Sequence, residues 1–302
     1  MRVDHTISPS DNTFGRYTID DAQQVLIEAF PEFKEFRGSR FQYATWSENH
    51  IFSPVLLNTA RFSLSRTVVA ATTPSGISGP QYSFVPGQET GNISIGGVAG
   101  WGGGATDPST SRQNIFTASD DLFYTHGRHS LKFGSLFNHY QFYKETGSLS
   151  RGQLSFASVT TFLAAAPTAV IAVTPGSILD RTYHYDTLGF YAQDDVRMSS
   201  TLTLNLGLRY EFNTTWHEVR GHGSALRNVL EDAAFTLGDP FVNPSLRNFG
   251  PRLGFAWDVM GNGKTAVRGG GGLLYDVGNW GAALGANETA TPPFSSSRYS
   301  LR

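Results

Sequence analysis

The stretch TLTLNLGLRYEF, residues 201–212, alternates between polar and apolar side chains without interruption. Successive side chains of a β-strand point to opposite faces, so the alternation predicts a strand with one apolar and one polar face. The apolar face carries Leu202, Leu204, Leu206, Leu208, Tyr210 and Phe212. The polar face carries Thr201, Thr203, Asn205, Gly207, Arg209 and Glu211. The fold therefore depends on whether the apolar face meets a protein core or lipid.

Composition favours β structure with many turns. Charged residues make up 16% of the chain, against about 25% in typical soluble domains, while Gly (33), Phe (22) and Tyr (12) are abundant. The net charge of −2 gives no general attraction to nucleic acid or to anionic membranes. The chain has no cysteine, which excludes disulfides and thiolate metal sites.

The same alternation recurs in pairs of segments joined by short turns, which predicts a series of hairpins and about ten strands. The turns fall at 8–12, 52–55, 127–129, 198–200 and 260–263. Between the hairpins lie long segments rich in Gly, Pro, Ser, Thr and Asn, at about 20–40, 68–112, 145–181 and 217–247. Within them, residues 20–30 and 158–167 have the composition of short helices.

Short turns at one end and long loops at the other are typical of a transmembrane β-barrel, with periplasmic turns and extracellular loops. Loops beyond roughly 15 residues are uncommon inside compact domains, and a soluble sandwich distributes its loops more evenly. A soluble antiparallel sheet with one solvent-exposed face gives the same alternation in any single strand. We therefore favour an all-β antiparallel transmembrane barrel and keep the soluble sheet as the alternative.

In a barrel the two faces of each strand acquire separate roles. The lipid-facing candidates are Leu202, Leu204, Leu206, Leu208, Phe255 and Trp257. The lumen-wall candidates are Asn205, Arg209, Glu211, Arg252 and Arg268. One position conflicts with this assignment. Alternate residues of a strand share a face, so if Phe190 and Ala192 point outward, Asp194 does too. Either Asp194 lies below the hydrocarbon, close to the turn, or a bulge resets the register.

No stretch of the sequence predicts an active site, a cofactor site or a metal site. His217 and Glu218 begin an HExxH-like pattern, but the second histidine, His222, comes one residue late and lies in a Gly-containing segment. The Gly-rich stretches do not match a phosphate-binding GxGxxG, and no GxSxG nucleophile motif occurs. We therefore expect a protein that is not an enzyme and binds no cofactor.

The stretch GFYAQDDVRMSSTLTLNLGLRYEF resembles a barrel hairpin of TonB-dependent outer-membrane receptors. The next hairpin, NFGPRLGFAWDVMGNGKTAVRGGGGLLYD, is similar to the Oar-like branch of that family. Further resemblances are RVDHTISPSDNTFGRYT, SDDLFYTHGRHSLKFG and FASVTTFLAAAP. The resemblance implies a barrel of roughly 22 strands around an N-terminal plug, energised through a TonB box, in the outer membrane of a Gram-negative cell.

Residues 1–302 correspond to part of such a barrel domain, with no plug, TonB box or signal peptide visible, so we expect a fragment. The resemblance implies an intact protein that moves a large substrate across the outer membrane with TonB-supplied energy. Its partners would be outer-membrane lipid, an unidentified extracellular ligand and, only through the missing N-terminal region, the TonB complex. Two alternatives stay open, a structural or adhesive barrel with surface-binding loops and a secreted glycan-binding β-sandwich.

Overall fold

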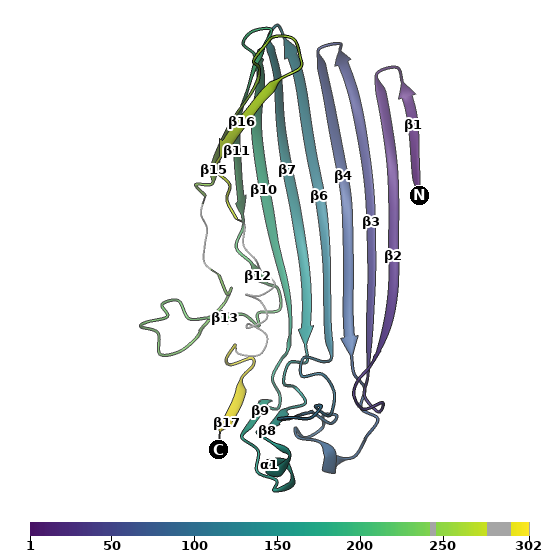
Figure 1. The fold of residues 1–302 in the computed structure, drawn as a ribbon, viewed down its shortest axis with the longest axis vertical. Helices are drawn as coiled ribbons and strands as arrows, with labels where there is room; N and C mark the ends of the chain where they lie inside the picture. Colours follow the sequence, from purple (N-terminus) through teal and green to yellow (C-terminus); the bar gives the residue numbers. More distant parts are fainter. Residues whose placement is uncertain (242–245, 277–290, 302) are drawn as a thin grey trace.

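The computed structural model describes residues 1–241, 246–276 and 291–301. Its dominant feature is one antiparallel sheet of long strands that follow one another in chain order (Figure 1). These strands are β1 (Arg2–Ser8), β2 (Asp11–Ile27), β3 (Lys34–Ser53), β4 (Leu56–Thr72), β6 (Ser109–His126), β7 (His129–Thr146), β10 (Asp180–Arg197), β11 (Leu202–Asn213), β15 (Phe249–Asp258) and β16 (Ala266–Gly272). Every hairpin predicted from the sequence is present.

Local turn chemistry fixes the tight ends of the hairpins. The Ser199 hydroxyl accepts hydrogen bonds from the backbone N–H groups of Thr201 and Leu202, at 3.2 and 3.1 Å. In the last turn the Asp258 carboxylate accepts from the N–H groups of Gly261 and Gly263, at 3.1 and 2.7 Å. Both glycines have positive φ, 66° and 72°, which side chains disfavour. The turns are therefore encoded by their own short sequences.

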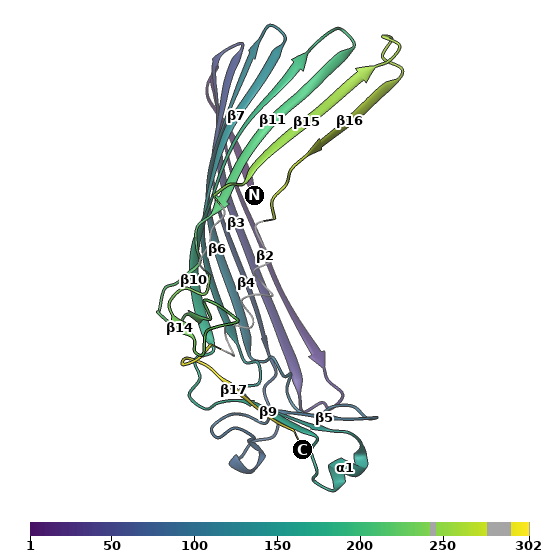
Figure 2. The same cartoon turned by 90° about the vertical axis from the view of Figure 1, so that its left-hand side faces the viewer.

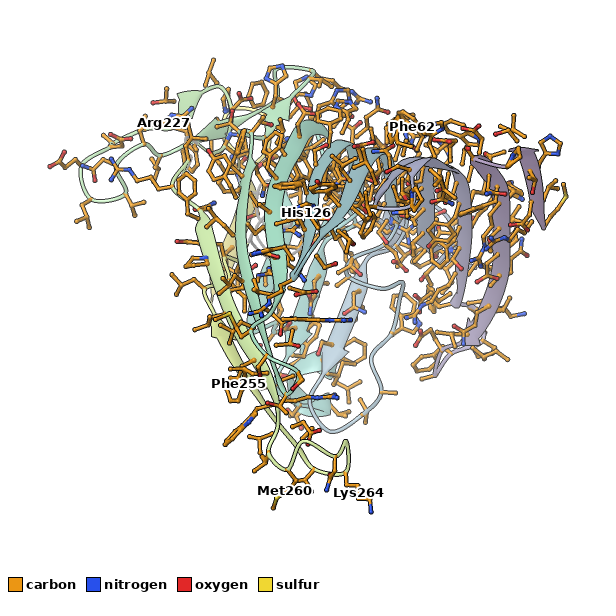
Figure 3. The ribbon with its side chains drawn as sticks, turned by 90° about the horizontal axis from the view of Figure 1, so that it is seen from above. Phe62, His126, Arg227, Phe255, Met260 and Lys264 are labelled. Carbon is orange, nitrogen blue, oxygen red and sulfur yellow. The ribbon has the colours of Figure 1, made fainter. Side chains whose placement is uncertain are left out.

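The register carries one face continuously across the sheet. Directly opposed positions run from Trp46 through Phe62, Ala118, Phe137 and Leu188 to Phe212. The neighbouring row, on the other face, runs from Asn12 through Asn49, Thr59, Asp121, Gly134 and Tyr191 to Arg209. The sheet curves into an arc, and Phe62 lies on its convex side (Figure 3). The convex face thus carries an apolar band, and the matching rows of the concave face are largely polar.

Among the residues that the structure describes, none forms a layer over the convex face. Phe62 is 53% exposed, Trp257 45% and Leu208 48%. The buried apolar side chains in the described residues lie instead at the loop end of the sheet, either in the loops or in the strand residues next to them. They include Phe33, Phe156, Val173, Tyr183 and Trp216. Because a soluble sandwich buries the apolar face of its sheet against a second sheet, this arrangement excludes the sandwich.

The arc does not close. The strand order begins at β1 and ends at β16, and Figures 1 and 3 show these two strands on opposite margins of the sheet. Within the part of the chain that the structure describes, each of them has one edge without a partner strand in this sheet.

The long loops fold into a small module, here called the loop module. It comprises β5 (Asn92–Ile95), β8 (Gln153–Phe156), β9 (Ala169–Val173) and β17 (Ser297–Leu301), in the order β17-β9-β8-β5. The helix α1 (Val159–Leu163) confirms the helix predicted at 158–167, and Ser158 and Thr161 form its capping box. A 3-10 turn, η1 (Pro80–Tyr82), and the short strands β12 (His217–Glu218), β13 (Ser224–Ala225) and β14 (Thr236–Leu237) complete the loops.

The other predicted helix is wrong. Residues 20–27 belong to β2, where Val25 lies opposite Phe36 and Asp20 opposite Phe41 of β3. Pairing with a long neighbouring strand overrides the weak helical preference of this stretch. The first predicted long segment, 20–40, therefore shrinks to a connection at 28–33 between β2 and β3. The other three persist at 73–108, at 147–179 and, in the described residues, at 214–241 and 246–248.

Within the described residues, no helix has the length and apolar character needed to cross a membrane.

Candidate functional site: the concave wall and the loop module

The pairing register places all the lumen-wall candidates on the concave face. Asn205 lies opposite Gly254, Arg252 opposite Gly207, and Arg209 opposite Gly250. Arg268 lies opposite Ala256 of the same face. Glu211 follows Arg209 by two residues on β11. The five side chains thus share one surface, here called the concave wall, while their role in a lumen stays a prediction.

The lipid-facing candidates share the other face. Leu202 lies opposite Trp257, and Leu204 lies opposite Phe255. Leu206 and Leu208 continue the same alternation along β11. No register shift separates β10 from β11, so Asp194 is directed outward, opposite Leu206. It lies three residues before the end of β10 and forms an ion pair with His129 at 2.6 Å, which favours the position near the turn over a bulge.

Hydrogen bonds within the concave wall hold its polar groups in place. The Asn205 side-chain amide donates to the Asp195 carboxylate at 2.6 Å, and the Gln193 amide donates to the same carboxylate at 3.2 Å. The Arg209 guanidinium contacts the Glu211 carboxylate at 2.8 Å. A wall whose charges are paired offers a polar surface to solutes without holding any single ion tightly.

A second part of the concave wall, on β6, β7 and β10, was not identified from the sequence. The Tyr191 hydroxyl donates to the Asp121 carboxylate across Gly134 of the intervening strand. Lys132 lies 3.9 Å from the same carboxylate and 5.2 Å from the centre of the Tyr191 ring. The alternation read on residues 201–212, applied to SDDLFYTH and GFYAQDD, would have placed these side chains on this face.

Arg252 and Arg268 differ from the other charged groups of the wall. Among the described residues, no carboxylate forms an ion pair with either guanidinium, and both side chains are exposed. A cavity of about 140 Å³ opens beside Arg252, Arg209 and Glu211. Gly207 leaves room opposite Arg252, since a Cβ atom there would lie 3.6 Å from the Cβ of Arg252. This end of the wall therefore offers free positive charge to an anionic solute.

The loop module lies beyond the loop end of the sheet and extends beneath its concave side (Figure 2). Buried polar contacts join its loops. The Arg151 guanidinium, 8% exposed, donates to the Thr73 carbonyl at 2.6 Å and pairs with Glu89 at 2.7 Å. Phe33, 1% exposed, packs edge-on against Trp101 at 5.3 Å. Close backbone approach is possible because Gly91 has no Cβ, which would lie 2.2 Å from the Gly152 carbonyl.

The histidines considered for zinc do not converge on Glu218. Its carboxylate, 2% exposed, accepts hydrogen bonds from the backbone N–H groups of Thr182 at 3.0 Å, Arg220 at 3.1 Å and His222 at 2.6 Å. His217 instead pairs with Asp239 at 3.0 Å. Glu218 therefore shapes the loop that follows β12.

One group in the described residues has the spacing of metal ligands. Single ligand atoms of Asp11, Glu48 and His50 lie within 4.8 Å of one another at the turn end of β2 and β3. The Nδ1 atom of His50 also lies in hydrogen-bonding contact with the Asp11 carboxylate, which accounts for the cluster without a metal.

The comparisons with known proteins agree with this architecture. A family profile described as an outer membrane beta barrel domain matches residues 1–301. Among solved structures, the outer membrane transporter YddB from Escherichia coli is similar, with a TM-score of 0.58 and 11% sequence identity, which shows the fold alone. That similarity covers 92% of this chain and 31% of the transporter, so the chain spans less than half of that relative. No curated protein matches the chain.

A curved antiparallel sheet with an uncovered apolar convex face, short turns and long loops has the architecture of a barrel wall in lipid. The family profile covers almost the whole of this sheet. The chain belongs to the outer-membrane β-barrel domain family and is located in the outer membrane.

Proposed function

We propose that this chain is part of the barrel of a TonB-dependent transporter of the Oar-like branch. In this proposal the intact protein moves a large substrate across the outer membrane with energy supplied through TonB. The loop module captures the substrate at the cell surface, and the concave wall provides the polar path along which it passes. The proposal includes no chemical step, so the chain is not an enzyme.

The observation that carries the proposal is the breadth of the arc. Eight strands suffice to close a barrel whose interior side chains fill its lumen. Here the path from β1 to β16 has ten strands and its ends still do not meet. The completed barrel is therefore wider than a small closed one, and barrels of about 22 strands hold a plugged lumen. An open arc of this breadth also fits porins of about 16–18 strands, so the plug and the TonB dependence in this proposal come from the resemblance of the hairpin sequences to TonB-dependent receptors.

Two further features support the transport proposal. The similar solved structure is described as an outer membrane transporter. The loops of this chain are also folded, since β5 and β8 pair across loops that are separated by a complete hairpin. A preformed module binds a ligand with a lower ordering cost than flexible loops.

The test uses the intact protein that contains this chain, expressed in cells with and without TonB. Depletion of metal chelates, oligosaccharides and peptides from the medium is measured for each strain. We expect depletion of one compound class that requires both the protein and TonB. Depletion that is independent of TonB would contradict energised transport. Adhesion of the cells to a surface, without any depletion, would favour the structural or adhesive barrel.

A further inference from the structure

The convex face contains a groove that the barrel architecture alone does not require. The groove has a volume of about 700 Å³ and crosses β1 to β6. Its floor is formed by Gly15 and Ala44, and a Cβ atom at Gly15 would meet nothing within 4 Å. Its walls are Trp46, Phe62, Leu64 and Phe116. The missing side chains at the floor create a hollow in an otherwise filled apolar surface.

Aromatic side chains form one wall of the groove. The rings of Trp46 and Phe62 are stacked at 5.7 Å with an interplanar angle of 21°. Leu64 lies opposite both Ala44 and Phe116, so the groove is bounded on the side of β6. A shallow apolar groove with Trp46 and Phe62 on one side and Leu64 and Phe116 on the other fits a lipid acyl chain.

Toward the loop end, the groove leads into a patch of arginines on the same face. Arg66 follows Leu64 by two residues on β4, and Arg112 precedes Phe116 by four residues on β6. Because the two strands are antiparallel, both arginines lie nearer the loop end than the groove does. The Arg66 guanidinium donates to the Asn114 side-chain oxygen at 3.0 Å, and the Arg112 guanidinium lies 5.0 Å from the centre of the Tyr143 ring. Because the two residues lie on adjacent strands, both charges can reach a single anionic group.

These two charges are available. No carboxylate among the described residues forms an ion pair with Arg66 or Arg112. Of the nearby outward carboxylates, Asp21 is bound by Arg40. Glu145 accepts only from the neutral Tyr143 hydroxyl at 3.3 Å and keeps its charge, which the two guanidinium groups outweigh. The patch therefore has a local positive charge although the whole chain has a net charge of −2.

The height of the patch fixes which lipid layer it meets. Arg66 is ten residues from Leu56, the first residue of β4 after the periplasmic turn. At about 3.3 Å per residue and a strand tilt of roughly 40°, this corresponds to about 25 Å, the height of the apolar band. The guanidinium groups consequently lie at the outer lipid–water interface, where the phosphates of outer-leaflet lipid are found.

We propose that the groove and the arginine patch together bind a phosphorylated glycolipid of the outer leaflet, of the lipid A class. An acyl chain occupies the groove between Trp46 and Leu64, and a phosphate group binds between Arg66 and Arg112. Apolar shape and positive charge are both needed, because either alone would accept any lipid or any anion. The site is independent of transport and does not rely on the proposed function.

The experiment measures lipid retention by native mass spectrometry of the intact protein in mild detergent. The probes are bisphosphorylated lipid A, enzymatically dephosphorylated lipid A and phosphatidylethanolamine. The variants are Arg66→Gln and Arg112→Gln, singly and combined. Arg61→Gln is the matched control, since Arg61 is on the same strand but lies on the opposite face, opposite Ser47. Heat modifiability on a gel verifies that each variant is folded.

We expect the parent protein and Arg61→Gln to retain bisphosphorylated lipid A above both other lipids, with each single variant losing roughly fivefold, as expected for one cation at an anionic surface. Equal retention of the three lipids would overturn the proposal. Unchanged retention of bisphosphorylated lipid A in the combined variant would also overturn it, because the two arginines would then not be needed. An equal loss in Arg61→Gln would overturn it too, because positive charge would then act from either face, without the groove.

Discussion

The hydroxyl of Tyr191 bonds to the carboxylate of Asp121 across a strand that separates them, and Gly134 is what makes this contact possible. A Cβ atom at Gly134 would lie 2.2 Å from the Tyr191 ring. The glycine therefore allows one aromatic ring to lie flat on the concave wall and to link three neighbouring strands. This contact joins β6, β7 and β10 on the concave face.

The substitution Gly134→Val should displace the Tyr191 ring and break its bond to Asp121. Because overpacking in a rigid sheet costs about 1–3 kcal/mol, we expect the free energy of unfolding to fall by that amount. The measurement is urea-induced unfolding of the intact protein in lipid vesicles. Gly189→Val is the matched control on the same face, since the nearest atom to a Cβ at Gly189 would lie at an ordinary contact distance of 3.7 Å. An equal loss of stability in both variants would refute the role of the ring.

The convex face carries several carboxylates, among them Asp186 and, near the turn end, Asp120. Asp120 lies opposite Ala60 and is exposed, and the Asn58 side-chain amide donates to both of its oxygens at 2.9 and 3.0 Å. Asn58→Leu leaves this carboxylate unpaired in lipid, so we expect a loss of about 1–3 kcal/mol in the free energy of unfolding.

The double variant Asn58→Leu with Asp120→Leu should recover at least the parent stability, because a polar pair in apolar surroundings is replaceable by packed apolar groups. Both variants are compared by urea unfolding in vesicles. A double variant that is less stable than Asn58→Leu alone would show that this part of the convex face does not contact lipid.

Arg151 links separate loops of the loop module through the Thr73 carbonyl and Glu89. Arg151→Met removes both contacts and leaves the buried Thr73 carbonyl without this donor. We expect a loss of roughly 1–3 kcal/mol in local stability and faster protease cleavage within residues 73–108 and 147–179 on intact cells. Arg227→Met, in the separate loop after β11, should leave cleavage of those two segments unchanged. Cleavage at the parent rate would mean that the loops are held together by other contacts.

Much of the sheet can be predicted from the sequence because its signals are local. Residues 202–213 form β11 since their alternation and the preceding Ser199 turn need no distant partner. The stretch 20–27 escapes this reasoning, because its strand conformation is imposed by β3. The loop module escapes it for the same reason, since β5 and β8 are short strands that pair in parallel between separate loops.

The same distinction between local signals and strand pairing applies to the residues of the candidate site. Arg209, Arg252 and Arg268 are placed on one face by alternation alone, and the pairing register agrees. The contact between Tyr191 and Asp121 depends on which strands become neighbours and on the exact register at Gly134. The groove at Gly15 and Ala44 depends on β2, β3 and β4 lying side by side, which no single segment specifies.

The central claim is that the convex face contacts lipid and the concave face contacts water. The chain has no cysteine, so single cysteines can be introduced without background labelling. Thr203, Asn205 and Gly207 on the concave face, and Leu204, Leu206 and Leu208 on the convex face, are replaced one at a time and labelled with an environment-sensitive fluorophore in vesicles containing brominated lipid. We expect quenching by lipid only at the three leucine positions, with a period of two along β11. Uniform quenching, or quenching at positions 203, 205 and 207 instead, would contradict the account.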